Sequence, residues 1–589
     1  MNPIPQNQLG LNASQIQVKD KYRLISEIAR RRGFFWGSFE IYGGVSGFLD
    51  LGPYGVTLRR RLEDEWRNIF LKPHGFLEIS TPIITASKVL EASGHVANFK
   101  DPMTECSNCK RRFRADQIVK DAAGIETEGL SLEQLGALLK EKNVRCPECG
   151  GQLGQPEYFH TMFRTTIGPY SEDVAYGRPE AAQGVFINFR RLMEVSREKF
   201  PTGIAQIGTA LRNEISPRQG PIRLREFTIM DFEFFFDPDQ PDCPYLKEVE
   251  DDILSIVTEN IRKTGKDNDR VNISVAHALR DGIVKAPWAA YFMALAKTFL
   301  LALGIPSENQ RFFEKLPDER AHYSAQTFDL EVRLDRWGWV EVAGFAYRTD
   351  YDLKSQMIAS GTDMRVFRPY EKPIEKTTMV IKPNYQRLRA IFGNEAGRVG
   401  GLLASADPTK LANSSQSVEL DGFVVQRDCF ELKQETVREA GAKFLPYVIE
   451  PSFGVERLLY ATLEYSLKMN EDRIILSIPP KLAPVQAAVF PLLGKDGLPD
   501  RAMAIFTDLS REGLRVEYDE AGSIGRRYAR ADEAGIPVGI TVDYDTLKDG
   551  TVTLRDRDTW KQLRRPTRDL SGLVRKIVEN GFQSIESET

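Results

Sequence analysis

Four arginines and two glutamates surround one turn within residues 209–236: Arg212, Arg218, Arg223 and Arg225, with Glu214 and Glu226. A segment rich in proline and glycine divides the stretch, which predicts an antiparallel hairpin whose return strand runs from Ile222 to Phe236, with one face buried and the other lining a site. Because the arginine fork suits phosphate oxygens, the hairpin could hold a polyphosphate. A solvated, salt-bridged hairpin is the alternative that the charges alone leave open.

Four cysteines form two pairs with the same spacing: Cys106, Cys109, Cys146 and Cys149. A two-residue spacing lets both thiolates of a pair reach one tetrahedral ion, and glycines after the second pair permit the tight turn that such a site needs. Four thiolates leave no open position for a catalytic water, so we expect a structural zinc ion. Redox or incidental cysteines are the alternative. Cys243 and Cys429 stand alone and are expected to be ordinary thiols.

Length and composition indicate a protein of several domains. With 589 residues, three or four domains are expected, and 42% hydrophobic and 28% charged residues are typical of a soluble globular protein. No run of eighteen apolar residues and no charged-then-apolar leader occurs, which predicts a cytoplasmic protein without membrane spans. A net charge of -4 argues against non-specific coating of nucleic acid but leaves room for a local basic face.

Periodicity predicts the elements that must position these residues. Helices are expected at 21–32, 54–72, 185–199, 245–262 and 288–303, and strands at 75–82 and 338–344. Residues 117–145 are expected to be mostly helical. From Ile478 onward, short apolar strands alternate with helices at 499–511 and 525–534, which predicts an α/β domain with parallel strands.

The order of residues around the predicted hairpin resembles a known family. Arg212-Asn213-Glu214, a Pro/Gly loop and then Arg225-Glu226-Phe227 is similar to motif 2 of the class II aminoacyl-tRNA synthetases, in the form found in glycyl-tRNA synthetases. The helix and strand that end at Pro82 resemble motif 1, the dimer element of that family. Residues 446–457 resemble motif 3, and residues 525–532 resemble the anticodon-binding domain of class IIa synthetases. The resemblance is to the homodimeric archaeal and eukaryotic-like glycyl enzymes.

This resemblance implies an α+β fold: an antiparallel catalytic sheet flanked by helices, a zinc-binding insertion and a C-terminal α/β anticodon-binding domain. The expected domain bounds are 1–20 (polar lead-in), 21–100 (core with motif 1), 101–158 (zinc insertion), 159–236 (core with motif 2), 237–330 (helical insertion), 331–369 (core), 370–443 (second insertion), 444–477 (core with motif 3) and 478–589 (anticodon-binding domain). Basic and acidic residues nearly balance in the last domain, so base stacking and hydrogen bonds would have to carry RNA binding.

The resemblance also implies a reaction, in which glycine and ATP form a glycyl-adenylate and the glycyl group passes to the 3′-hydroxyl of tRNA(Gly). The substrate carboxylate attacks the α-phosphate itself, so the protein positions reactants and stabilises charge. Arg212 and Arg457 are the expected catalytic residues, and Glu341 is expected to hold Mg²⁺ on ATP. The expected ATP-binding residues are Arg212, Asn213, Glu214, Arg223, Phe227, Glu341, Val342 and Arg457.

Glycine offers only an ammonium and a carboxylate for recognition, so several acids converging on the ammonium would select it and leave no room for a methyl group. The resemblance implies the glycine-binding residues Arg114, Glu180, Asp231, Arg348, Glu450 and Ser452. Asp231 stands where a glutamate is expected in relatives. Diadenosine tetraphosphate synthesis is a further activity within the family. The alternatives are a class II synthetase for another small amino acid, such as proline, threonine or serine, and a non-catalytic paralogue.

Overall fold

The computed structural model describes residues 18–586, except 126, 128, 170–171, 218, 266–268, 409–410, 412–416 and 471–472. Residues 1–17 of the predicted lead-in, and Arg218 of the predicted hairpin, therefore lie outside the described residues. The chain divides into two compact units, one formed by residues 1–364 and 446–589 and the other by residues 365–445. No helix of the described chain is long and apolar enough to cross a bilayer.

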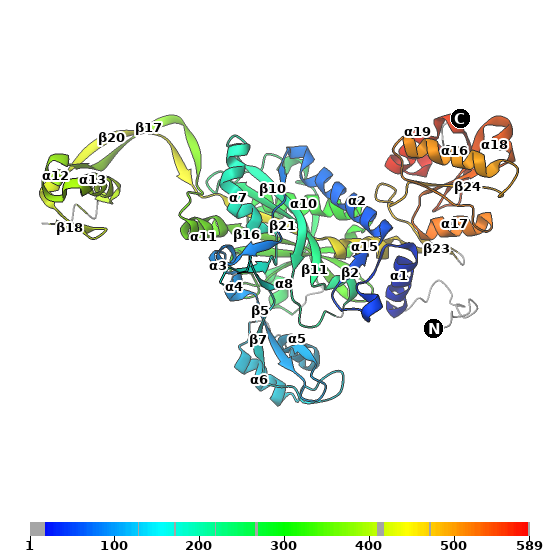
Figure 1. The fold of residues 1–589 in the computed structure, drawn as a ribbon, viewed down its shortest axis with the longest axis horizontal. Helices are drawn as coiled ribbons and strands as arrows, with labels where there is room; N and C mark the ends of the chain where they lie inside the picture. The colour runs from blue at the N-terminus through cyan, green and yellow to red at the C-terminus, as the bar shows by residue number, and fades with distance from the viewer. Residues whose placement is uncertain are drawn as a thin grey trace. The chain divides into compact units, whose positions relative to one another are not determined.

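A nine-stranded sheet organises the larger unit (Figure 1). Its neighbours pair antiparallel, except that β3 runs parallel to β10 and β12 parallel to β14. In spatial order the strands are β13 (Val271–Ser274), β12 (Ile253–Val257), β14 (Gln310–Glu314), β15 (Gln326–Leu334), β16 (Gly338–Thr349), β21 (Tyr447–Gly454), β11 (Glu226–Phe236), β10 (Thr202–Leu211) and β3 (Leu77–Ile79). The predicted antiparallel catalytic sheet is confirmed.

Strand β11 divides its side chains between the two faces of this sheet. Met230, Phe232, Phe234 and Phe236 join the main hydrophobic core. That core also holds apolar side chains from three helices, α2 (Pro53–Phe70), α10 (Pro287–Ala302) and α15 (Val455–Ser466). The alternate residues of β11 face the other way. Phe235 of that set packs on two phenylalanines of α7 (Ala182–Val195). Both faces of β11 are buried from Thr228 onward: one face packs in the main core, and Phe227 and Ile229 of the other face line a cavity.

The predicted hairpin is present, with different bounds. Strand β10 ends at Leu211 and β11 begins at Glu226, so the connecting loop is longer than the Pro/Gly segment alone. Residues expected at the start of the return strand form the short helix η4 (Gly220–Ile222), and the loop closes where the Arg212 N–H donates to the Arg225 carbonyl (2.8 Å). Proline lacks a backbone N–H and cannot extend the ladder here.

The expected helix over 245–262 is wrong, and so is the helical character of 237–330. That segment contributes β12, β13, β14 and the start of β15 to the central sheet, with only short helices beside α10: η5 (Leu246–Glu248), α8 (Glu259–Lys263), α9 (Val275–Arg280) and η6 (Ser307–Asn309). Leu254 and Ile256 of β12 are buried in the main core. This packing outweighs the helix-like spacing of the acids around the strand.

Several shorter helices and strands complete this unit. Helix α1 (Val18–Arg32) precedes the paired strands β1 (Phe35–Gly37) and β2 (Leu49–Leu51), with η2 (Glu40–Tyr42) between them and η3 (Lys72–His74) after α2. A three-stranded sheet carries β4 (Ile84–Ala86), β9 (Val174–Gly177) and β8 (Arg164–Thr166), and the helices α3 (Ser87–Ala92) and α4 (His95–Asn98) follow β4. Helix α11 (Tyr351–Ser360) follows β16, and β22 (Leu467–Asn470) pairs with β23 (Arg473–Leu476).

The cysteine pairs lie in turns beside a separate small sheet that has its own hydrophobic core. Strand β5 (Lys100–Glu105) pairs with β6 (Arg112–Arg114) and with β7 (Glu157–His160). Two helices, α5 (Ala115–Ala123) and α6 (Leu132–Glu141), occupy the expected helical excursion. Helix α6 begins with a capping box between Ser131 and Gln134, which satisfies orphan donors at its first turn.

The C-terminal region is the predicted α/β domain. Its sheet has the order β25 (Val516–Tyr518), β24 (Ala487–Pro491), β26 (Val538–Val542), β27 (Thr551–Asp556) and β28 (Gln562–Pro566). The first three strands run parallel, as predicted, and the last two pair antiparallel. The helices are α16 (Leu498–Arg511), α17 (Ile524–Glu533), α18 (Tyr544–Asp549) and α19 (Leu570–Asn580), with η9 (Thr567–Asp569) and η10 (Phe582–Ile585).

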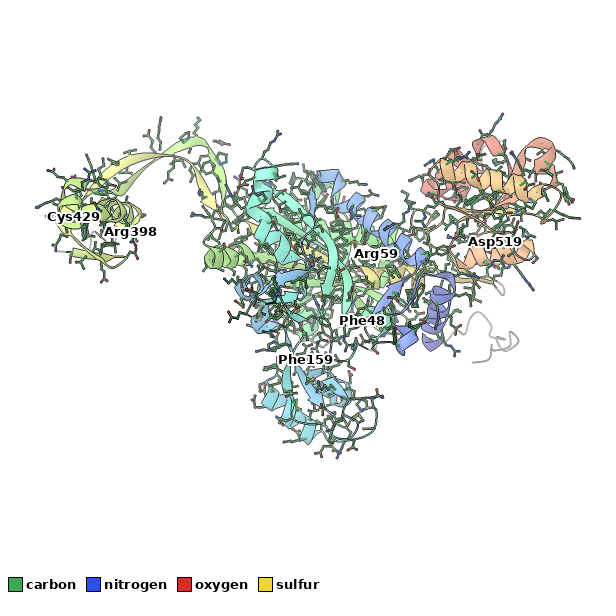
Figure 2. The ribbon with its side chains drawn as sticks, viewed as in Figure 1. Phe48, Arg59, Phe159, Arg398, Cys429 and Asp519 are labelled. Carbon is green, nitrogen blue, oxygen red and sulfur yellow. The ribbon has the colours of Figure 1, made fainter. Side chains whose placement is uncertain are left out.

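Residues 365–445 form the second unit. Two long strands, β17 (Val366–Pro383) and β20 (Phe430–Phe444), pair antiparallel along most of their length. The chain between them folds into α12 (Tyr385–Phe392), η7 (Gly393–Glu395), α13 (Ala396–Ser405), β18 (Ser417–Leu420), β19 (Phe423–Gln426) and η8 (Arg427–Cys429). Cys429 lies in the small core of this unit, and Arg398 pairs at its surface with Asp421 (2.6 Å; Figure 2).

Candidate active site

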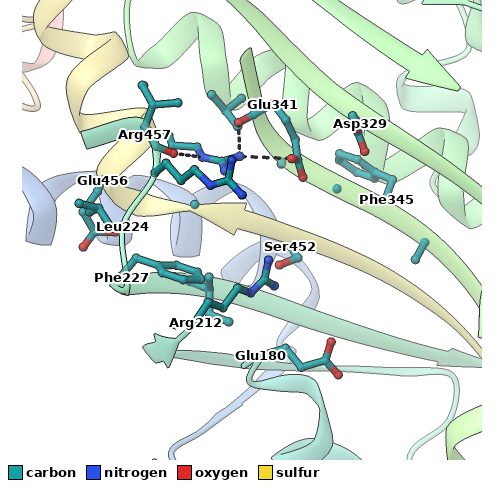
Figure 3. A pocket seen from close by; sticks show the side chains of 18 of the residues that line it. Glu180, Arg212, Leu224, Phe227, Asp329, Glu341, Phe345, Ser452, Glu456 and Arg457 are labelled. Carbon is teal, nitrogen blue, oxygen red and sulfur yellow. Dashed lines mark hydrogen bonds and ion pairs between the residues drawn. The ribbon is translucent and has the colours of Figure 1, made fainter. Parts of the chain in front are cut away.

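A cavity of about 240 Å³ lies where β11, β16 and β21 run side by side (Figure 3). Most of the predicted site residues line it: Glu180, Arg212, Glu214, Arg223, Phe227, Glu341, Val342, Glu450, Ser452 and Arg457. Asp231 and Arg348 do not line it but contact residues that do. Segments far apart in the sequence therefore meet at one site.

At one end of the cavity, Arg457 joins two of the lining strands and the hairpin loop. It follows the start of α15, and its Nη1 donates to the Glu341 carbonyl (2.7 Å) and approaches Glu341 Oε2 (3.2 Å), as Figure 3 shows. Its Nε donates to the Ile222 carbonyl (2.9 Å). Although burial favours the neutral acid, the charge of Arg457 lowers the pKa of Glu341. The guanidinium thus has a fixed place and an ionised partner.

The hairpin places a second arginine and an aromatic ring across from Arg457. The Arg212 guanidinium lies over the Phe227 ring, 5.4 Å from its centroid, and its Nε donates to the Pro179 carbonyl (3.1 Å). In the same loop, Arg223 donates from Nε and Nη2 to Glu214 Oε2 (2.7 and 2.6 Å). A flat ring flanked by cations suits a nucleotide base joined to phosphates.

At the other end, acidic side chains from three elements converge. The strand register sets Asp231 of β11 opposite Ser452 of β21, and the Ser452 hydroxyl donates to Asp231. The other Asp231 oxygen accepts from the Ala181 N–H (2.9 Å), just after Glu180. Burial raises the pKa of Asp231 to about 6, so its carboxyl is ionised near neutral pH.

Arg348 lies fully buried behind these acids. Its Nε and Nη2 donate to the two oxygens of Asp352 (2.7 and 3.0 Å), its Nη1 donates to Glu450 (2.6 Å), and the Tyr323 ring covers it at 3.7 Å. The fork expected to receive the substrate carboxylate is therefore already engaged by protein carboxylates. A carboxylate could bind there only by exchanging with one of them.

Burial raises the pKa of two further carboxyls. Glu233 is fully buried, neither of its oxygens has a hydrogen-bond partner among the described residues, and burial raises its pKa well above the usual range. Burial, together with the charges of Glu180 and Asp231, raises the pKa of Glu450 to about 8, although the Arg348 guanidinium 2.6 Å away opposes this shift. The carboxyls of Glu180 and Asp231 are negatively charged near neutral pH, which suits a small cation such as an ammonium group.

Comparison with known proteins decides the family. Residues 486–578 match the anticodon binding domain model. The chain is 44% identical to the glycine–tRNA ligase of Aeropyrum pernix over 96% of its own length and 98% of the relative, and 44% identical to that of Thermococcus sibiricus over 95% and 99%. It is 42% identical to that of Methanocaldococcus jannaschii over 93% and 97%.

The chain belongs to the glycine–tRNA ligase family. The predicted resemblance to a class II glycyl-tRNA synthetase is confirmed, as is the C-terminal anticodon-binding domain. The roles of single residues and the exact domain bounds stay predictions.

One member of the site was missed from the sequence. Asp329 of β15 lines the cavity with Glu341, and both are labelled in Figure 3. Burial, and next the charge of Glu341, raises the pKa of Asp329 to about 7, although Lys315 lies 2.8 Å away. In sequence Asp329 is one of two acids in a strand whose apolar residues alternate with polar ones. No signal in this pattern separates Asp329 from Glu331, so spacing could not reveal its role.

Besides Asp231 and Arg348, two more predicted residues, Arg114 and Asn213, do not line the cavity. Arg114 pairs with Asp101 (3.3 Å) and with Asp116, at the start of the small zinc-module helix α5. Asn213 is held in place by its backbone, whose N–H donates to the Thr161 carbonyl (2.6 Å). Asn213 is adjacent in sequence to Arg212, whereas Arg114 lies near enough to the lining residue Glu214 for the charge of that residue to raise the pKa of Arg114 against the effect of burial.

The four paired cysteines meet as the spacing predicts. Their sulfur atoms all lie within 4.8 Å of one another, with Cys106 to Cys149 at 3.5 Å and Cys109 to Cys146 at 3.7 Å. Tetrahedral zinc with Zn–S bonds of about 2.3 Å requires sulfur atoms about 3.8 Å apart. The donor set and its spacing therefore fit zinc. Gly151 is required at this turn, since a Cβ there would lie 2.8 Å from the Cys106 sulfur.

Proposed function

We propose that this protein attaches glycine to tRNA(Gly) at the expense of ATP, through a glycyl-adenylate that is transferred to the terminal 3′-hydroxyl. One observation carries the proposal: in a chain of the glycine–tRNA ligase family, a single cavity has arginines and an aromatic ring at one end and paired carboxylates at the other. The two ends match ATP and an amino acid that has no side chain.

ATP would occupy the end of the cavity formed by the hairpin and α15. Phe227 would stack on adenine and Glu214 would accept from its amino group, after Arg223 turns from Glu214 toward the phosphates. Arg212 and Arg457 would stabilise the charge that develops on the α-phosphate as the glycine carboxylate attacks it. No protein nucleophile is required, because the chain only has to align two bound reactants.

The Mg²⁺ that accompanies ATP would lie between two carboxylates. Glu341 and Asp329 line the same part of the cavity, and the charge of Glu341 opposes ionisation of the Asp329 carboxyl. Oxygen ligands of this kind suit Mg²⁺, which would neutralise their repulsion and supply charge stabilisation to the phosphates. Asp329 thus joins the residues predicted from the sequence.

Glycine would bind with its ammonium between Glu180 and Asp231. Ser452 and Glu450 would close this end, and Arg348 would balance the buried negative charge, exchanging one partner when the substrate carboxylate arrives. Asp231 accepts from the Ala181 N–H and from the Ser452 hydroxyl, which would hold its carboxyl beside Glu180 for this role. Arg114 would approach glycine only if the zinc module moved toward the cavity. Larger amino acids are excluded by bulk, so no editing site is required.

The remaining parts would serve assembly and RNA binding. Zinc would bind the four cysteines and stabilise the module between residues 101 and 158. Residues 478–589 would bind the anticodon arm, and motif 1 would form the interface of a homodimer in the cytoplasm. Diadenosine tetraphosphate would form if the γ-phosphate of a second ATP attacked the α-phosphorus of the glycyl-adenylate, so that ATP took the adenylyl group and glycine was released.

The test is amino-acid-dependent exchange of pyrophosphate into ATP with glycine, alanine, serine, proline and threonine, followed by charging of tRNA(Gly). Exchange with glycine alone supports the proposal. Exchange with another of these amino acids would keep the fold and overturn the substrate. Absence of exchange with all five, with zinc and Mg²⁺ present, would indicate a non-catalytic paralogue.

A further inference from the structure

A histidine that the reaction scheme does not use lies directly behind the proposed ammonium site. His95, the first residue of α4, is fully buried, and its Nε2 is 3.1 Å from Glu180 Oε1. This is a close approach without the alignment of a hydrogen bond, and no described residue offers Nε2 another partner. The chain has only five histidines, so one placed here needs a reason.

The contacts of Glu180 are distributed unevenly between its two oxygens. His95 Nε2, Gln183 Nε2 (3.3 Å) and Arg348 Nη2 (3.5 Å) all approach Oε1. In the described part of the chain, no hydrogen bond reaches Oε2, and the shortest approaches of His95 and Arg348 are both to Oε1, while Glu180 lines the cavity. Donors on one oxygen fix the carboxylate and leave the other oxygen for the ligand.

We propose that His95 is a positioning residue: its Nε2–H holds Glu180 Oε1, so that Glu180 Oε2 faces the cavity and receives the ammonium of glycine. This inference rests on the proposed function, in which Glu180 binds the ammonium. It adds a residue from a different segment, which acts on glycine only through Glu180.

The surroundings of His95 set its tautomer. Ser93 Oγ lies 2.7 Å from His95 Nδ1 and also near the carbonyls of Val89 (3.2 Å) and Leu90 (3.3 Å). If the serine hydroxyl donates to Nδ1, the neutral ring carries its proton on Nε2. If it donates to a carbonyl, Nδ1 carries a proton, and only the charged ring then presents N–H to Glu180. A lone pair on Nε2 would repel the carboxylate, so both arrangements place a proton on Nε2.

The ring of His95 is also held in orientation. Phe99 stacks on it at 5.2 Å between centroids, and Tyr323 lies at 6.4 Å, nearly parallel. The Ser93 carbonyl is in turn 3.0 Å from His322 Nε2. This contact requires glycine at position 94, between Ser93 and His95, because a Cβ on Gly94 would lie 2.9 Å from His322 Nε2. The φ of Gly94 is +81°, which also favours glycine. Such a preset ring spares reorganisation when glycine binds.

The test measures KM for glycine, KM for ATP and kcat in pyrophosphate exchange for wild type and three variants. We expect His95→Leu to raise KM for glycine by about tenfold to a hundredfold with KM for ATP within about twofold of wild type, because the lost donor contacts a charged acceptor. His95→Gln, which keeps an N–H donor, should recover part of the loss. Ser93→Ala should raise KM for glycine by a few fold.

A matched control separates positioning from packing. His74 is a second internal histidine, bonded to the Tyr291 hydroxyl (2.8 Å) and stacked near Phe76 and Tyr245. His74→Gln should lower thermal stability and leave KM for glycine unchanged. If His95→Leu changed both KM values and kcat together, the positioning role would be refuted.

Failure of this inference differs from failure of the proposed function. A wild-type protein that showed no exchange with glycine would overturn the proposed function. A wild-type protein active with glycine, in which Glu180→Gln raised KM for glycine and neither His95→Leu nor His95→Gln did, would overturn the role of His95 alone. If His95→Leu does not fold, wild-type KM values in both His95→Gln and Ser93→Ala would overturn that role equally.

Discussion

The hydroxyl of Ser452 should control the charge of Asp231, and Ser452→Ala tests this. In the native site the hydroxyl donates to Asp231 and lowers its pKa, opposing the effect of burial and leaving the value at about 6. Five other charged or titratable groups act on the same carboxyl: Glu180, Glu233, Glu450, Arg178 and Arg348. The substitution changes none of them, so the shift should report the lost hydrogen bond.

The size of the effect follows from the strength of that bond. A hydrogen bond to a charged acceptor contributes about 1.5–3 kcal/mol, which corresponds to about one to two pKa units. The pKa of Asp231 should therefore rise from about 6 to about 7–8 in the variant. At pH 7 the ionised fraction would fall from about nine-tenths to between about a half and about a tenth. Since the ammonium needs the ionised form, KM for glycine should rise about twofold to tenfold.

The assay is the pH dependence of KM for glycine in pyrophosphate exchange between pH 6 and 9. Because the folded pKa is raised, the defect should be greatest below it and should nearly vanish at pH 9, where Asp231 is ionised in both proteins. Titration of free glycine is common to both and cancels in the ratio. A defect of equal size at every pH would refute the reasoning and assign Ser452 a direct contact. Ser466→Ala, at a buried serine of α15, is the control.

Three further outcomes are expected. Cys149→Ser should lower zinc content below that of the Cys243→Ala control and expose residues 101–158 to protease, since a tetrahedral site loses one of four ligands; full zinc in the variant would count against the site. The carboxyl of Asp329 has a pKa of about 7, so the site should bind Mg²⁺ about tenfold more weakly at pH 6 than at pH 8. The measurement is the Mg²⁺ concentration required for exchange, and Asp329→Asn should abolish its pH dependence. In the wild-type protein Arg555 donates to both Asp532 oxygens (2.9 and 3.1 Å), so Asp532→Ala should leave a buried charge without its partner. The free energy of unfolding of the C-terminal domain should fall by about 3–5 kcal/mol. The variant should lose tRNA charging and retain pyrophosphate exchange without tRNA. Equal loss of both activities would contradict that separation.

The sequence could predict the site residues that lie close together in short sequence motifs. Arg212, Glu214 and Phe227 flank one turn, and Cys106 and Cys109 are two residues apart, so spacing alone brought them together. His95 and Asp329 have no such neighbours: each reaches the site through a chain reversal or a strand register that only the folded sheet defines. Local pattern could not reveal them.

The wrong predictions have a similar cause. The strand β12 (Ile253–Val257) is expected to be helical because acids surround a short apolar run, and only its place beside β14 explains why it extends. Ile222, expected at the start of the return strand, instead ends the short helix η4, and β11 pairs with β10 only from Glu226 onward. Tertiary packing decides both cases.

The paired strands β17 and β20 make residues 365–445 a cassette. Val366 lies opposite Phe444, and the pairing continues, apart from one irregularity, to Pro383 opposite Phe430, so the chain leaves and returns at neighbouring points. Directly opposed residues of an antiparallel pair are only about 5 Å apart, a span that a tight turn closes. Residues between the two strand ends could therefore be removed, shortened two residues at a time or replaced by a reporter domain without changing the path of the rest of the chain. Lineages can gain or lose such a module in one genetic step, and engineers can use the same joint.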